Sequence, residues 1–193
     1  MNKKKILVGV VAMLILSSAA VFLLFNNSKP QKNQIPTGVL NEFNSNKVDK
    51  SNYESANLAQ FSISYPNSFT PSEHLLSGDE GVALILDSEE LEKNNGSFVV
   101  EKYPIDTVTL NSLKEYFNKS KLSQEDISLG QARIQAVYFT GEIPSLQGSI
   151  QQNVILVSYN GYVYKIQMSY VSEEKKEQLD QEFKNISSTI NFL

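Results

Sequence analysis

The chain has 193 residues, of which 17 are Lys or Arg, 21 are Asp or Glu, one is His and none is Cys. The absence of Cys excludes a disulfide framework, thiolate metal sites, iron–sulfur ligation and a cysteine nucleophile. With 41% hydrophobic and only 20% charged residues, the composition also excludes a disordered polymer and a coiled coil. We therefore expect a single folded domain with attached segments.

The N-terminus contains a candidate membrane anchor. Three lysines at positions 3–5 precede an uncharged run at 6–25, ILVGVVAMLILSSAAVFLLF. A helix rising about 1.5 Å per residue needs about 20 apolar residues to cross a hydrocarbon core of about 30 Å, so the run predicts a transmembrane helix that holds the chain to the membrane. The alternative is a cleavable signal peptide ending at Ala20, after which the domain would be secreted. Such cleavage would leave the apolar terminus VFLLF exposed.

The residues around this run predict the topology. The positive-inside tendency places the tail 1–5 in the cytoplasm. The stretch 26–57 is rich in Asn, Ser and Lys and has no persistent period, which is typical of a flexible stalk. Residues 58–193 then form the extracytoplasmic domain of a single-pass protein of the cell membrane.

The charge of this domain bears on its partners. Residues 58–193 contain 10 basic and 18 acidic residues, and Arg133 is their single arginine. Nucleic-acid binding draws on clustered Arg and Lys. We therefore expect no nucleic acid as a partner.

The first predicted elements are strands. Phe61, Ile63 and Tyr65 alternate with serines before Pro66, which indicates a half-buried strand. A second strand is expected at 81–87, apolar on both faces and so central in a sheet. After an Asn-Gly turn, a third strand is expected at 97–103.

A helix and a fourth strand follow. Thr109 is placed to cap a helix whose apolar stripe, at spacings of three and four, should face a sheet. A strand is then expected at 132–140, again with apolar residues on both faces.

The turn Asn160-Gly161 lies between two β-rich runs and predicts a hairpin, because this dipeptide suits the positive φ angles of a type I′ turn. If Tyr159 pairs with Tyr162, then Val157 meets Tyr164, and one face carries nearly all the large side chains. The other face should be partly covered by a helix end or a loop.

The chain ends in a predicted helix. Ser172 is expected as its N-cap, and an apolar stripe at spacings of four, three and four should dock on the hairpin: Leu179, Phe183, Ile186 and Ile190. The order of elements predicts an α+β fold with an antiparallel sheet covered by helices, preceded by the transmembrane helix.

The order of elements resembles the PsbP-like family. The resemblance lies in FSISYPNSF at 61–69, the hairpin NVILVSYNGYVYKIQMSY at 153–170 and the closing FKNISSTINF at 183–192. It implies a central antiparallel sheet sandwiched between helical layers, and a non-enzymatic binding or assembly role, since members include a nuclear branch that binds a small GTPase. This chain differs from the photosynthetic members by its predicted membrane anchor, and no functional site of those members is recognisable in it. The resemblance therefore does not imply a photosystem role.

The candidate site residues are Glu73, His74, Asp79 and Glu80, in the polar segment between the first two strands. They would serve as acid and base or bind a cation. A mobile surface loop accounts for the same residues, and one His does not make a zinc site.

Two further groups have both functional and structural interpretations. The acidic run Asp87, Glu89, Glu90 and Glu92 would attract calcium, but it lacks the spacing of a calcium loop and is typical of a solvated face. The tyrosines of the hairpin would form either an aromatic recognition surface or core under the last helix: Tyr159, Tyr162, Tyr164 and Tyr170.

Ser172 and Lys175 match a Ser-x-x-Lys pattern, but its companion motifs are missing and a helix-capping role accounts for Ser172. No other motif for a catalytic, metal or cofactor site occurs in the sequence, so we expect no cofactor. The leading hypothesis is a membrane-anchored extracytoplasmic binding or scaffold module, without catalytic activity, that holds a protein partner. The alternatives are an extracytoplasmic hydrolase or metal-dependent enzyme that uses the four candidate residues, and a calcium-responsive stabilising protein.

Overall fold

The computed structural model describes residues 41–42, 49–58, 61–75, 82–130, 132–145, 148–171 and 173–193. Within these ranges the helices are α2 (Glu89–Lys93), α3 (Leu110–Lys119) and α4 (Lys176–Ser188). The strands are β1 (Asn41–Glu42), β2 (Tyr53–Leu58), β3 (Phe61–Pro66), β4 (Thr70–Leu75), β5 (Val82–Asp87), β6 (Ser97–Pro104), β7 (Ser123–Leu129), β8 (Ile134–Ser145), β9 (Gly148–Tyr159), β10 (Tyr162–Tyr170) and β11 (Asn191–Phe192).

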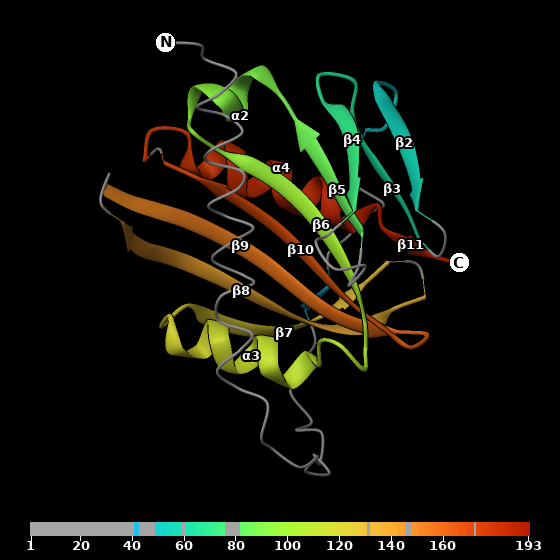
Figure 1. Cartoon of the computed structure of the whole chain (residues 1–193). Helices are drawn as coiled ribbons and strands as arrows, with labels where there is room; N and C mark the ends of the chain where they lie inside the picture. The colour runs from blue at the N-terminus through green and yellow to red at the C-terminus, as the bar shows by residue number, and fades with distance from the viewer. Residues whose placement is uncertain are drawn as a thin grey trace. The chain divides into compact units, whose positions relative to one another are not determined.

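A large twisted sheet forms the centre of the domain (Figure 1). Its order is β1-β7-β8-β9-β10-β6-β5-β4. Neighbours run antiparallel, except that β1 lies parallel to β7. The strands expected at 81–87, 97–103 and 132–140 are confirmed as β5, β6 and β8. β5 pairs on both sides and its residues 83–86 are buried, as its apolar sequence predicts.

The hairpin of β9 and β10 has the predicted register. Tyr159 pairs with Tyr162, and Val157 pairs with Tyr164. Asn160 and Gly161 have φ angles of 46° and 80°, which this two-residue turn requires. The local turn chemistry therefore sets which side chains of both strands face the core.

The helices cover opposite faces of the large sheet (Figure 1). Thr109 caps α3 as predicted, because its hydroxyl accepts a hydrogen bond from the backbone N–H of Ser112. Phe117 of α3 packs on the face formed by Phe139, Val154 and other apolar residues. On the other face lies α4, and the residues of the predicted stripe are buried in the main core: Leu179, Phe183, Ile186 and Ile190. Ile190 lies beyond the end of the helix at Ser188.

A second, three-stranded sheet of order β11-β3-β2 was not predicted. It packs on the same side of the large sheet as α4. There the rings of Phe61 and Tyr164 meet edge to face, with their centres 5.4 Å apart. The helical layer of the expected sandwich is therefore part helix and part sheet on this side. β1 and residues 53–57 of β2 lie in the range 26–57 that the sequence assigned to a stalk, and β2 pairs with β3 along its length.

Two other boundaries differ from expectation. β4 lies in the polar segment for which a surface loop was the alternative, and no element was predicted over 123–129. Both segments form strands, each paired with an apolar neighbour, β5 or β8. Helix α4 begins at Lys176, and its N-cap is Lys175, which makes no side-chain capping bond. Ser172, the cap predicted from the sequence, lies outside the described residues. Among the described residues, no helix has the length and apolar character needed to cross a membrane. The anchor predicted at 6–25 lies outside them.

Candidate functional site

The structure describes only part of the predicted acid–base group. Glu73 lies on edge strand β4, exposed and paired with Leu84, so it belongs to a strand and not to a loop. His74 is the next residue of β4, and its side chain lies outside the described part, as do Asp79 and Glu80. Within the described ranges, no three metal-ligating side chains come together. The enzyme hypothesis for these residues stays a prediction.

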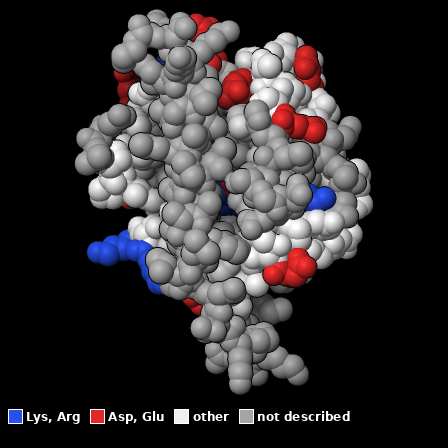
Figure 2. All heavy atoms as spheres, in the orientation of Figure 1, with Lys and Arg blue, Asp and Glu red and all other residues white. Residues whose placement is uncertain are grey.

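The acidic run stabilises a short helix. Ser88 caps α2, and Glu89, Glu90 and Glu92 lie in its first turn, where negative charge complements the helix dipole. Glu89 also pairs with Lys93 at 3.0 Å. Acidic side chains stand at several separate places on the face in Figure 2, where basic ones are sparser.

The hairpin tyrosines divide between core and surface. Tyr164 and Tyr170 are buried, as the core interpretation predicts. Tyr159 and Tyr162 are half-buried beside the turn, and both pack against the edge of the core. The position of each tyrosine relative to the turn therefore decides between the two interpretations.

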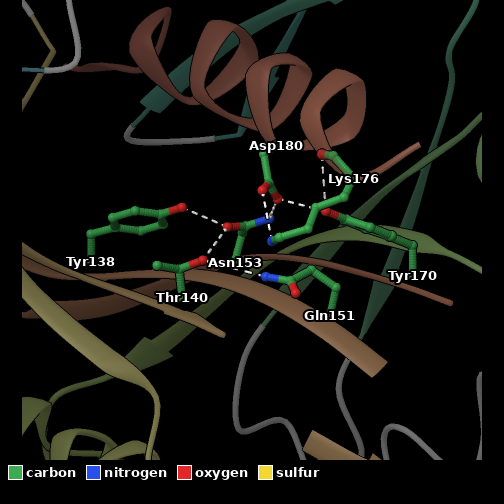
Figure 3. Close-up of polar contacts among 7 residues, drawn as sticks. All are labelled: Tyr138, Thr140, Gln151, Asn153, Tyr170, Lys176 and Asp180. Carbon is green, nitrogen blue, oxygen red and sulfur yellow. Dashed lines mark hydrogen bonds and ion pairs between the residues drawn. The ribbon is translucent and has the colours of Figure 1, made fainter. Parts of the chain in front are cut away.

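A polar network that sequence reasoning missed joins α4 to the sheet (Figure 3). At its centre, Oδ1 of Asn153 accepts hydrogen bonds from the hydroxyls of Tyr138 at 2.5 Å and Thr140 at 2.9 Å. The Asn153 amide then donates to Asp180 of α4 at 2.5 Å. Asn153 is fully buried, so these bonds satisfy an amide that would otherwise destabilise the core.

The Asp180 carboxylate collects three donors. In addition to Asn153, it accepts a hydrogen bond from the Tyr170 hydroxyl at 2.6 Å and an ion-paired one from Lys176 at 3.0 Å. Burial raises the pKa of Asp180, but the hydrogen bonds from Tyr170, Asn153 and Lys176 outweigh burial and hold the pKa below its ordinary value. A carboxylate held ionised by three donors is a poor proton acceptor, which argues against a role in proton transfer. Because its partners Asn153 and Tyr170 belong to the sheet, the network acts as a clamp, a set of hydrogen bonds that holds α4 on the sheet.

The tyrosine hydroxyls of this network are held protonated. Burial raises the pKa of Tyr138 to about 12. Burial and the neighbouring Asp180 raise the pKa of Tyr170 further. At neutral pH both groups therefore serve as hydrogen-bond donors. One acceptor of the network is unsatisfied, because among the described residues no donor reaches Oε1 of the buried Gln151.

The surface at the tip of the hairpin is apolar and aromatic, and we call it the aromatic end. Ile105 and Leu193 are 44% and 63% exposed. The backbone N–H of Ile105 donates to the Gly161 carbonyl at 3.0 Å, and the Tyr159 ring lies 5.0 Å from that of Phe192. The aromatic end consists of exposed Ile105, half-buried Tyr159 and Tyr162, the buried Phe192 that contacts Tyr159, and the exposed Leu193 that follows Phe192 in the chain.

Rigid elements position the aromatic end. Tyr162 begins β10, and the ammonium group of Lys102 lies 4.0 Å from the centre of its ring, a cation–π contact. Beneath this surface the Tyr164 ring lies 5.4 Å from the Phe61 ring and 5.3 Å from the Phe192 ring, measured between ring centres. The side chains beneath this surface are therefore tightly packed.

Comparison with known proteins identifies the fold. The sequence matches no protein-family model and no curated protein sequence. Cyanobacterial PsbP (CyanoP) from Synechocystis matches 86% of this chain and 100% of its own, with 10% identity and a TM-score of 0.51.

Two further solved structures are more distant. LpqN of Mycobacterium tuberculosis, involved in cell envelope biogenesis, matches 72% of this chain and 90% of its own, at 9% identity and a TM-score of 0.43. A Bacteroides thetaiotaomicron protein matches 69% of this chain, at 13% identity and a TM-score of 0.45, and this chain spans 45% of its length. With its antiparallel sheets, few helices and likeness to CyanoP, the chain has a PsbP-like α+β fold.

Proposed function

We propose that this chain is a membrane-tethered, extracytoplasmic binding module, and that it holds a protein partner through the aromatic end. The observation that carries the proposal is that exposed Ile105, bonded to the turn residue Gly161, lies beside half-buried Tyr159 and Tyr162, which flank the turn. Exposed Leu193 follows Phe192, whose ring contacts Tyr159. Apolar and tyrosine side chains on a rigid support are typical of the centre of a protein interface. A partner that presents an apolar patch complements this surface.

The tether rests on a separate argument. The run 6–25 is long and apolar enough to span a bilayer, and the lysines before it favour a cytoplasmic tail. The excess of acidic residues in 58–193 directs the module toward protein partners and away from nucleic acid.

Membrane fractionation with protease protection tests the tether and its orientation. We expect the intact chain in the membrane fraction, with 58–193 digested only from the extracytoplasmic side. Digestion from the cytoplasmic side, or recovery of the whole chain as soluble protein, would contradict the topology.

Site-specific photo-crosslinking in the host tests the surface. An aromatic crosslinking side chain at Tyr162 should give a discrete adduct with a membrane or envelope protein. The matched control places it at Tyr116, 39% exposed on α3. Ile105→Glu should abolish the Tyr162 adduct and leave the melting temperature nearly unchanged, because Ile105 is largely outside the core. Equal adducts at both positions, or an adduct that survives Ile105→Glu, would refute the role of the aromatic end.

A further inference from the structure

The chain contains two Asn-Gly dipeptides, Asn95-Gly96 and Asn160-Gly161. Asn95 and Asn160 are both exposed, with φ angles of 48° and 46°. In such a dipeptide the backbone nitrogen of Gly can attack the side-chain carbonyl carbon of Asn, since Gly has no side chain to block the approach. The reaction requires that this nitrogen be open to solvent and free to move.

The Gly96 nitrogen is engaged and enclosed. Its N–H donates to the carbonyl of Leu91 at 2.7 Å. A Cβ atom at Gly96 would lie 2.9 Å from the carbonyl oxygen of Ser169 and 3.1 Å from Cβ of Tyr170, so the surrounding atoms leave no free space. Attack on Asn95 therefore requires a local opening of this part of the structure.

The Gly161 nitrogen is open. A Cβ atom at Gly161 would have no atom within 4 Å. Among the described residues, none accepts a hydrogen bond from the Gly161 N–H. The hydrogen bond between Gly161 and Ile105 instead uses the carbonyl of Gly161 as acceptor. Two identical dipeptides in one chain thus differ in the access to the reacting nitrogen.

We propose that Asn160 is a site of spontaneous deamidation in the native protein, and that Asn95 is protected from it. The Gly161 nitrogen forms a bond to Cγ of Asn160, the bond from Cγ to the side-chain nitrogen breaks, and ammonia leaves with the proton of the Gly161 N–H. Water then opens the succinimide ring at either carbonyl. The products are aspartate and isoaspartate at position 160, with no change of oxidation state.

The modification acts where the hairpin turn meets the aromatic end. It places a carboxylate next to Tyr159, and the isoaspartate product adds one backbone atom to a two-residue turn. Such a turn fixes the register of its strands, and the carbonyl of Gly161 also holds Ile105. Deamidation therefore alters the charge and the shape of this surface together.

The purified full chain, kept in mild detergent at slightly alkaline pH, provides the test. Peptide mapping by mass spectrometry follows the replacement of the side-chain NH₂ by OH at both positions, and an isoaspartate-specific methyltransferase identifies the isomer. We expect position 160 to react at least about tenfold faster than position 95, because attack at position 95 must first break a hydrogen bond and open an enclosed site.

The same measurement in concentrated denaturant is the control. Unfolding removes the protection of Gly96, so the two rates should become similar. The proposal is refuted if Asn95 reacts as fast as Asn160 in the native protein, if neither reacts natively although both react when unfolded, or if the rate ratio is unchanged by denaturant. Asn160→Gln should remove the fast phase while near-UV circular dichroism confirms that the variant is folded.

Discussion

Replacing Asp180 by Ala removes the acceptor on which the polar network converges. The hydroxyl of Tyr170 and the amide of Asn153 are both buried, and a buried donor left without a partner costs about 1–3 kcal/mol. The Asp180 side chain is 21% exposed, so water can satisfy part of this loss. Its ion pair with the 40% exposed Lys176 contributes less than about 1 kcal/mol. We expect Asp180→Ala to lower the free energy of unfolding by about 3 kcal/mol.

A double-mutant cycle with Tyr170→Phe isolates the central bond. In the native background this change removes a hydroxyl bonded to a carboxylate and should cost about 1.5–2 kcal/mol. In the Asp180→Ala background the hydroxyl retains only the Lys176 carbonyl at 3.2 Å, so the same change should cost less than about 0.5 kcal/mol. The coupling free energy should therefore exceed about 1 kcal/mol.

Urea unfolding of the full chain in mild detergent measures these values. All nine tyrosines lie at or beyond position 53, so the tyrosine bands of near-UV circular dichroism report on residues 53–193. Additivity of the two changes within about 0.5 kcal/mol would show that the hydrogen bond does not contribute to stability. In that case the network would not be the clamp that holds α4.

Three other predictions follow from described groups. Because the pKa of Asp180 is held below 3.8, its stabilisation should be present above about pH 4 and lost as the pH falls through the folded pKa; urea titrations of Asp180→Asn should lack this loss. The pKa of Tyr138, raised to about 12, predicts stability lost as the pH rises from about 10 to 12, with a smaller loss in Tyr138→Phe. Gly96→Ala should lower the free energy of unfolding by about 1–3 kcal/mol, because the added Cβ would press on the Ser169 carbonyl. Gly161→Ala should lower it by only about 1 kcal/mol, because the cost there is the positive φ alone. Thermal melts of the two variants test this difference.

The features predicted correctly from the sequence are those encoded locally. Asn160-Gly161 fixed the hairpin and its register through turn chemistry, and Thr109 fixed the start of α3 through its hydroxyl. The apolar stripe of α4 identified its buried face. In each case the deciding residues lie close together in the chain, so no distant partner had to be known.

The features that were missed depend on residues far apart in the chain. Asp180 reads as an ordinary polar residue beside an apolar stripe, and its partner Asn153 lies 27 residues earlier. A polar Asn on the face that carries the large side chains was the one available signal. β4 is a polar strand stabilised by pairing with β5, and such pairing leaves no period in its own sequence. β7 begins with polar residues and pairs with β8, and Ile127 and Leu129 near its end enter the core, an alternation too short to predict the strand.

The closing position of β11 has a consequence for synthesis. Phe192 pairs with Phe61 of β3, and Phe183 and Ile190 fill the main core shortly before it in the chain. A chain emerging from the ribosome or a translocation channel therefore cannot complete this core until residues 183–192 have emerged. Until then the sheet face that α4 covers exposes apolar side chains to aggregation, so the domain folds fully only after synthesis has passed these residues.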